Sequence, residues 1–437
     1  MKYYSTRRSA PEASLADAVI RGLAPDKGLY MPERIVPLPA SFYDRMASLS
    51  LREIATEVAG AFFGEDVEAE ALRTIVRETL AFDIPLVQVD EGLWSLELYH
   101  GPTAAFKDVG ARFMARLLRY CTSRQGGADG RDVDVLVATS GDTGSAVANG
   151  FLGVEGIRVC VLYPKGKVSE IQEKQFTTLG RNITALEVDG TFDDCQRLVK
   201  EAFMDATLGE RLRLTSANSI NVARFLPQAF YYFHAVAQLQ AAGERRPPVV
   251  GVPSGNFGNL TAGLFAARMG LGVARWVAAN NRNDIFLQYL RTAQYAPRPS
   301  VQTIANAMDV GDPSNFARIL DLYGHSHEAI VRDIGGASYT DAEIRAAMRE
   351  CLDSRGYLLD PHGACAYRAL RDGLRPGETG IMLETAHPAK FRDVVEEATG
   401  ASVTIPATLQ RFMDGRKQAV PMTARFEDFR DFLLQRN

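Results

Sequence analysis

A single lysine beside apolar residues is the first position in this sequence that could do chemistry. Lys107 stands between Phe106 and Asp108 in the stretch HGPTAAFKDVGARFMARLL, at the expected start of a helix. A cation is unfavourable at the positive end of a helix dipole, and apolar neighbours desolvate an amine, so both features favour a lowered pKa for Lys107. An amine of that kind can form a Schiff base with a carbonyl compound. The alternative is a solvent-exposed surface charge, which is the default for any one lysine.

Three loops that follow expected buried strands could bind the anionic groups of a ligand. They are ATSGDTGSA at 138–146, VPSGNFGNLTAG at 252–263 and LETAHPAKF at 383–391. Small residues leave backbone amides open and a following helix adds its dipole, so the second loop could hold a phosphate without a basic side chain. The glycine loops could equally be tight turns with a helix cap. The chain contains neither GxxxxGK[ST] nor GxGxxG, which weakens a nucleotide-binding hypothesis.

The remainder of the sequence predicts a scaffold that would gather these loops. After about residue 95, β-branched apolar runs alternate with amphipathic stretches, which indicates an α/β fold with parallel sheets covered by helices. Ligands of such sheets bind at the C-terminal ends of the strands. The expected strands are 132–139, 157–164, 183–189, 247–253, 274–280 and 379–385. The expected helices include 106–120, 145–152, 192–206 and one long helix over 220–243.

Residues 1–95 are expected to form a separate N-terminal unit. They contain helical patterns and short Pro/Gly turns, and no run in them predicts a buried strand. The remaining residues, 96–437, would form the catalytic region.

The composition excludes several classes of protein. The 53 acidic and 49 basic residues give a net charge of -4, so no general basic surface exists for nucleic acid or an anionic membrane. The five cysteines are odd in number and never form CxxC, which argues against a disulfide framework and a zinc site, and we expect no metal. We find neither a signal-peptide pattern nor a long apolar run, and therefore expect a cytoplasmic protein.

Taken together, the motifs resemble the pyridoxal-phosphate enzymes of the tryptophan-synthase-β family, and within it the threonine synthases of many bacteria and fungi. The shared motifs run in order along most of the chain. They are GLYMPE at 28–33, HGPTAAFKDVGARFM at 100–114, TSGDTGSAVANGF at 139–151, SANSINVARFLPQ at 216–228, VPSGNFGNLTAG at 252–263, NAMDVGDPSNFARI at 306–319, LDPHGACAYRAL at 359–370 and ETAHPAKF at 384–391. Related dehydratases usually have Asn where this chain has Asp142, so the SGDTG form favours the threonine synthase branch.

The resemblance implies a fold and a cofactor site. The fold would be tryptophan-synthase-β-like (fold type II), with two three-layer α/β lobes and the N-terminal unit. Lys107 would form a Schiff base with pyridoxal 5'-phosphate and transfer protons, and Thr385 would offer a hydroxyl to the pyridine nitrogen. Asp142 would lie near the 3-oxygen of the cofactor, where a carboxylate is electrostatically awkward. The cofactor phosphate would be held by Ser254, Gly255, Asn256, Phe257, Gly258 and Asn259.

The resemblance also implies a substrate site. Ser140, Asp142 and Thr143 would meet the substrate carboxylate. A second anion site for the phosphate of O-phospho-L-homoserine would be formed by Asn218, Ser219, Asn221 and Arg224. Neutral donors with one guanidinium suit a phosphate dianion, but a capped helix start would give the same Asn-Ser pattern.

The implied reaction converts O-phospho-L-homoserine and water to L-threonine and phosphate, by γ-elimination and addition of water at Cβ. Two alternatives remain open. One is a serine or threonine dehydratase or a β-replacement enzyme of the same fold, which would need no second phosphate site. The other is a cofactor-binding protein without turnover. We expect a small-molecule substrate, neither nucleic acid nor membrane as partner, and a monomer or homodimer.

Overall fold

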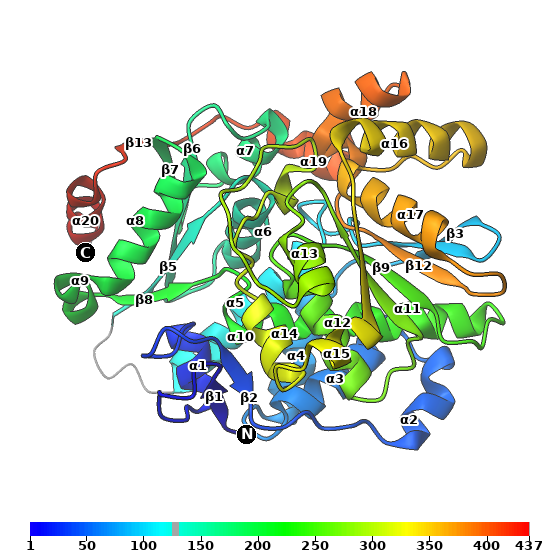
Figure 1. The fold of residues 1–437 in the computed structure, drawn as a ribbon. Coiled ribbons are helices and arrows are strands. Elements are labelled where there is room, and N and C mark those ends of the chain that lie inside the picture. The colour runs from blue at the N-terminus through cyan, green and yellow to red at the C-terminus, as the bar shows by residue number, and fades with distance from the viewer. Residues whose placement is uncertain (125–130, 437) are drawn as a thin grey trace. The chain divides into compact units, whose positions relative to one another are not determined.

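The computed structural model describes residues 1–124 and 131–436 (Figure 1). The chain forms two compact units, each composed of several chain segments. Unit 1 contains residues 1, 32–106 and 225–404, and unit 2 contains residues 2–31, 107–124, 131–224 and 405–436. This division by compactness differs from the expected boundary at residue 95, because 2–31 and 32–95 belong to different units. That boundary stays a prediction.

Unit 1 is centred on a six-stranded sheet in the order β11-β10-β9-β12-β4-β3, parallel except for the β3–β4 hairpin. Its strands are β3 Leu86–Asp90, β4 Leu93–Glu97, β9 Val249–Pro253, β10 Arg275–Asn280, β11 Ile334–Ser338 and β12 Gly380–Glu384. Its α-helices are α2 Ala40–Arg45, α3 Leu51–Phe63, α4 Ala69–Thr79, α11 Ala229–Ala241, α12 Gly258–Arg268, α13 Ile285–Thr292, α14 Phe316–Leu322, α15 His327–Asp333, α16 Asp341–Arg355, α17 Pro361–Gly373 and α18 Arg392–Thr399. Short 3-10 turns are η1 Met46–Ser48, η2 Leu226–Gln228, η3 Asn306–Met308 and η4 Pro388–Phe391.

Unit 2 contains a five-stranded, fully parallel sheet in the order β13-β7-β6-β5-β8. Its strands are β5 Val133–Ala138, β6 Ile157–Pro164, β7 Ile183–Asp189, β8 Arg213–Ser216 and β13 Val420–Thr423, beside the small pair β1 Tyr3–Ser5 and β2 Tyr30–Pro32. Its helices are α1 Leu15–Arg21, α5 Lys107–Arg124, α6 Asp142–Phe151, α7 Glu170–Thr177, α8 Phe192–Met204, α9 Ala206–Arg211, α10 Val222–Phe225, α19 Ala407–Met413 and α20 Phe426–Gln435. Helices α6 and α8 cover opposite faces of the sheet (Figure 1).

The six predicted strands are confirmed as β5, β6, β7, β9, β10 and β12. The predicted long helix over 220–243 is wrong in its middle, where η2 separates α10 from α11. Pro227 lies in that turn, because proline lacks the N–H that an uninterrupted helix needs and its ring clashes with the preceding turn.

The expectation of no buried strand before residue 95 is also wrong. Strand β4 starts at Leu93 and pairs with β12 inside the sheet. Its buried Ser95 and Glu97 both form hydrogen bonds with the hydroxyl of Tyr357, which is distant in sequence. Polar residues with tertiary partners hide the apolar pattern that marks a strand.

Three negative observations apply to the described residues. None of their helices combines the length and apolarity needed to cross a membrane. No cluster of three His, Cys, Asp or Glu residues among them is arranged to hold a metal ion. The five cysteines are all buried, free thiols.

Candidate active site

The segment before Lys107 is fixed to the end of β12 within unit 1. Ala105 forms an antiparallel bridge with Ala386, and the N–H of Phe106 donates to the carbonyl oxygen of Thr385 at 2.9 Å. Ala104 adopts the left-handed conformation (φ 54°) that turns the chain here. Backbone contacts thus join the predicted strand-end loop that carries Thr385 to the residues that directly precede Lys107.

Lys107 is the first residue of α5, as predicted, and in unit 2 it lies against Arg224. The Arg224 Nη1 donates to the Lys107 carbonyl oxygen at 2.5 Å, and its Nε donates to the Ala217 carbonyl oxygen at 3.0 Å. Gly110 permits this approach, because a Cβ there would lie 2.3 Å from the Arg224 carbonyl oxygen. The structure therefore places the predicted guanidinium against the backbone of Lys107 at the start of α5.

The loop before Arg224 contains two of the predicted asparagines. Asn221 has a structural role, and Asn218 has a buried side-chain oxygen without a hydrogen-bond partner among the described residues. The Asn221 amide donates to the Val19 carbonyl oxygen at 2.9 Å, and its Oδ1 accepts from the Ala223 N–H at 3.0 Å. The helix-cap alternative therefore describes Asn221. Ser219 lies between Asn218 and Asn221, half-buried.

The loop from β5 to α6 explains the carboxylate at position 142. Asp142 is the first residue of α6, where the helix dipole favours a negative charge. Its Oδ1 also accepts from Gln172 Nε2 at 2.9 Å. Gly141 (φ 144°) leaves room for that side chain, because a Cβ would lie 2.4 Å from it. The Thr139 hydroxyl accepts the N–H groups of Gly141 and Gly144 at 2.9 and 2.8 Å. This network orders the backbone that presents Ser140 and Thr143.

The loop Ser254–Asn259, between β9 and α12, has the features of an anion-binding turn. Phe257 is buried and left-handed (φ 63°), and no side chain caps the helix that follows it. Gly255 packs against η3, since a Cβ there would lie 2.6 Å from Met308 Cα. A non-glycine residue in the left-handed region is strained, and such strain is concentrated at functional sites. The helix start at this turn is thus left without a side-chain cap, as the predicted anion site requires.

Asn256 is held by residues that the sequence alone did not identify. The N–H of Ser314 donates to its Oδ1 at 2.6 Å, and Asn315 Nδ2 donates to its carbonyl oxygen at 3.1 Å. Arg318 Nη1 in turn donates to Asn315 Oδ1 at 2.6 Å. Because C=O and the next N–H point in opposite directions in a trans peptide, fixing the Asn256 carbonyl also fixes the N–H of Phe257.

Arg318 is fully buried and lies 4.1 Å from the ring centroid of Phe225. Burial lowers the pKa of its guanidinium to about 9. A buried guanidinium needs its acceptors, and Asn315 Oδ1 is one of them.

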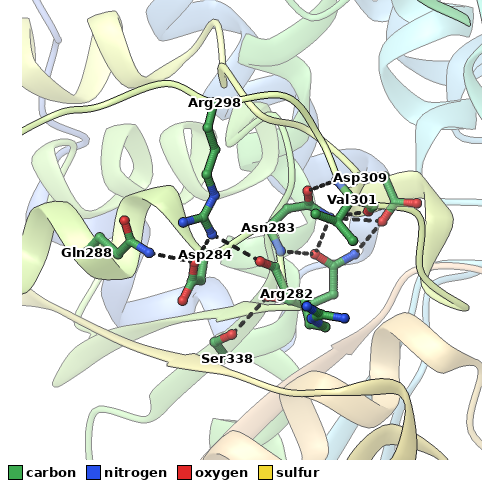
Figure 2. Close-up of polar contacts among 9 residues, drawn as sticks. Arg282, Asn283, Asp284, Gln288, Arg298, Val301, Asp309 and Ser338 are labelled. Carbon is green, nitrogen blue, oxygen red and sulfur yellow. Dashed lines mark hydrogen bonds and ion pairs between the residues drawn. The ribbon is translucent and has the colours of Figure 1, made fainter.

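The segment that contacts Gly255 is itself held by a polar cluster (Figure 2). The Asp309 carboxylate accepts from Asn281 at 2.8 Å, from Asn283 at 3.1 Å and from the Thr303 hydroxyl at 2.7 Å. Asn283 Oδ1 also accepts the N–H of Val301 at 2.7 Å. Burial raises the pKa of Asp309 to about 6. The cluster ties the long segment before η3 to the end of β10.

Asn259 tests whether the loop fits a phosphate. Its Oδ1 accepts from the hydroxyls of Tyr231 and Tyr232 at 2.6 and 2.7 Å. Its Nδ2 is buried without a partner among the described residues. An unpaired buried donor is costly, and phosphate oxygens are acceptors that would satisfy it. The donor set of the loop therefore fits a phosphate group.

The end of β12 that carries Thr385 rests on an acid and histidine network. Asp360 accepts from the Ala386 N–H at 3.2 Å and from His362 Nδ1 at 2.6 Å. The Asp360 N–H donates to Glu384 Oε1 at 2.6 Å. Burial, reinforced by Asp360, raises the pKa of Glu384 well above its usual range.

These features define a class of protein, a pyridoxal-phosphate-dependent enzyme. Residues 72–383 match the family model described as pyridoxal-phosphate dependent enzyme. Residues 2–80 match the threonine synthase N terminus, and residues 362–433 match the threonine synthase C-terminal region. The chain belongs to the threonine synthase family, and its cofactor is pyridoxal phosphate.

Individual relatives agree over the whole chain. It is 44% identical to threonine synthase from Escherichia coli (strain K12) over 414 residues, 95% of each protein. It is 42% identical to threonine synthase from Haemophilus influenzae over 435 residues, 100% of each. Among solved structures, E. coli threonine synthase has a TM-score of 0.92 at 42% identity, covering 100% of both chains. Threonine synthase from Brucella melitensis, with pyridoxal phosphate bound, has a TM-score of 0.93 at 35% identity, covering 100% of this chain and 99% of that one. The predicted fold, family and cofactor are confirmed.

Proposed function

We propose that the protein converts O-phospho-L-homoserine and water to L-threonine and phosphate. The observation that supports the proposal is the Asn259 donor in the Ser254–Asn259 loop, unsatisfied among the described residues, because it calls for an anion where the resemblance implies the cofactor phosphate. Family membership over the full chain, including the N- and C-terminal threonine synthase regions, favours this reaction over that of a dehydratase or a non-catalytic protein.

Each predicted cofactor residue keeps a role in this proposal. The loop Ser254–Asn259 would hold the cofactor phosphate through its N–H groups and the Asn259 amide. Thr385 would donate or accept at the pyridine nitrogen, and Lys107 would attach the cofactor through its amine. Asp142, at the start of α6 and hydrogen-bonded to Gln172, would lie near the 3-oxygen of the cofactor.

The substrate would be held by its two anionic ends. Ser140 and Thr143, with the amides at the start of α6, would bind its carboxylate. Arg224, Asn218 and Ser219 would bind its phosphate. Asn221 would act indirectly, because its side chain fixes the loop to Val19.

When bound, pyridoxal phosphate supplies an electron sink that stabilises negative charge on the substrate Cα. The Lys107 amine would take the proton from Cα, release it and, neutral again, take one from Cβ, so that the Cγ–O bond breaks and the γ-phosphate leaves. A proton returned to Cγ and water added at Cβ complete threonine, and the lysine returns the Cα proton. Arg224 lies beside Lys107, so we propose that it orients the leaving phosphate relative to this amine.

A direct assay tests the reaction. Purified protein with pyridoxal phosphate is given O-phospho-L-homoserine, and phosphate and threonine are measured beside Lys107→Ala. Equal amounts of both products from the wild type, with neither from the variant, are expected. Deamination of free threonine without turnover of the phosphorylated substrate would instead support a dehydratase. We also propose that the protein is cytoplasmic, which cell fractionation can check. We propose that its ligands are small molecules only.

A further inference from the structure

The orientation of the Asn259 amide is decided by its contacts with two tyrosines. The hydroxyl oxygens of Tyr231 and Tyr232 lie 2.6 and 2.7 Å from Asn259 Oδ1. These separations are typical of O–H···O bonds, whereas N–H···O bonds have their mode near 2.9–3.0 Å. The oxygen of the amide therefore faces both hydroxyls, and the nitrogen at the opposite end is a donor with no partner among the described residues.

Packing holds the rings of both tyrosines in place. Tyr231 and Tyr232 are buried on α11, with their ring centroids 5.1 Å apart. The ring of Tyr232 also meets Trp276 edge-on at 5.3 Å. Gly263 on α12 makes room for this arrangement, because a Cβ there would lie 3.0 Å from Tyr232 Cζ and 2.5 Å from Trp276. Burial raises the pKa of Tyr232 well above its usual value, so its hydroxyl stays a donor.

We propose that Tyr231 and Tyr232 are positioning residues that lock the Asn259 amide with its Nδ2 donor turned to the cofactor phosphate. The proposal rests on the proposed function, in which the Ser254–Asn259 loop holds that phosphate. A reversed amide would present an oxygen to an anion, and the lock prevents this. The hydroxyl pair therefore selects a phosphorylated cofactor over one with a neutral hydroxymethyl group at the same place.

The test compares two ligands that differ only in the phosphate. Apoprotein of the wild type, Tyr231→Phe, Tyr232→Phe and the double variant is titrated with pyridoxal phosphate and with pyridoxal, following the visible absorbance of the bound aldehyde. Tyr43→Phe is the matched control, because the Tyr43 hydroxyl also donates a hydrogen bond within unit 1, to the Met269 carbonyl oxygen at 2.8 Å. Circular dichroism and thermal midpoints verify the fold of every variant.

The expected result is a loss of preference for phosphate. The double variant should bind pyridoxal phosphate about tenfold more weakly and each single variant about threefold, whereas pyridoxal binding stays unchanged. Unchanged affinity for pyridoxal phosphate, or equal weakening for both ligands, overturns the proposal and leaves the proposed function standing. A wild type that binds no pyridoxal phosphate overturns both. If the double variant fails to fold, the two single variants decide by the same criterion.

Discussion

Replacement of Asn315 by Asp separates the stability of unit 1 from the geometry of its anion loop. The Asn315 side chain accepts from Arg318 through Oδ1 and donates to the Asn256 carbonyl oxygen through Nδ2. Asn315→Asp keeps the acceptor and replaces the donor by an oxygen, which repels the Asn256 carbonyl. Asn315→Ala removes both partners.

The two variants should therefore fail in different ways. A hydrogen bond to a charged group contributes about 1.5–3 kcal/mol, and Asn315→Ala leaves the buried guanidinium without it, so its free energy of unfolding should fall by about 3 kcal/mol. Asn315→Asp retains that bond, so its free energy of unfolding should stay within about 1 kcal/mol of the wild type. The Asn256–Phe257 peptide is then free to turn, and affinity for pyridoxal phosphate should fall by about tenfold.

Urea unfolding of the apoprotein measures the first quantity, and absorbance titration with pyridoxal phosphate measures the second. An Asn315→Asp protein that is stable and binds the cofactor as tightly as the wild type would refute the inference that Asn315 fixes the Asn256 peptide. Tight binding by a destabilised Asn315→Ala protein would lead to the same conclusion.

Three further predictions concern other parts of the chain. Arg224→Lys keeps a charge but not the planar donor set, so the KM for O-phospho-L-homoserine should rise about tenfold with a smaller change in kcat, and an unchanged KM would remove Arg224 from the phosphate site. Gly141→Ala places a Cβ against Gln172 in a strained conformation and should cost about 2–4 kcal/mol, measured by urea unfolding; a stable variant would contradict this. Burial lowers the pKa of His234 to about 4, so this residue stabilises the fold above about pH 6.5 and the contribution is lost as the pH falls toward 4. Between pH 7.5 and 4.5, the free energy of unfolding of His234→Gln should therefore fall less than that of the wild type, by up to about 3 kcal/mol. Urea midpoints that change with pH by the same amount in both proteins would show the reasoning wrong.

The sequence predicted the scaffold well where a local signal existed. The six strands are rich in apolar and β-branched residues, and Lys107 is found at the start of its helix as its neighbours indicated. Strand β11, with the sequence IGGAS, was missed because glycine and serine give no strand pattern, and its pairing with β10 places it in the sheet.

The partners of the site residues could not be predicted, because they come from distant segments. Gln172 and the tyrosine pair meet their targets only through the tertiary fold. Tyr231 and Tyr232 lie in an apolar helix, where a sequence pattern indicates a core residue and gives no sign of a hydroxyl contact. Asn315 and Arg318 fall within a motif that supports the family resemblance, but only the structure links them to Asn256.

The segmented composition of unit 2 has a consequence for synthesis of the protein. Strand β13, near the C-terminus, completes the sheet by pairing with β7, and Phe429 of α20 fills the core beside Leu198 of α8. While the chain emerges from the ribosome, that edge of β7 and that part of the core are uncovered until β13 and α20 have been made. An unpaired strand edge is a site of aggregation, so emergence of β13 and α20, rather than translation of the catalytic motifs, ends the vulnerable period.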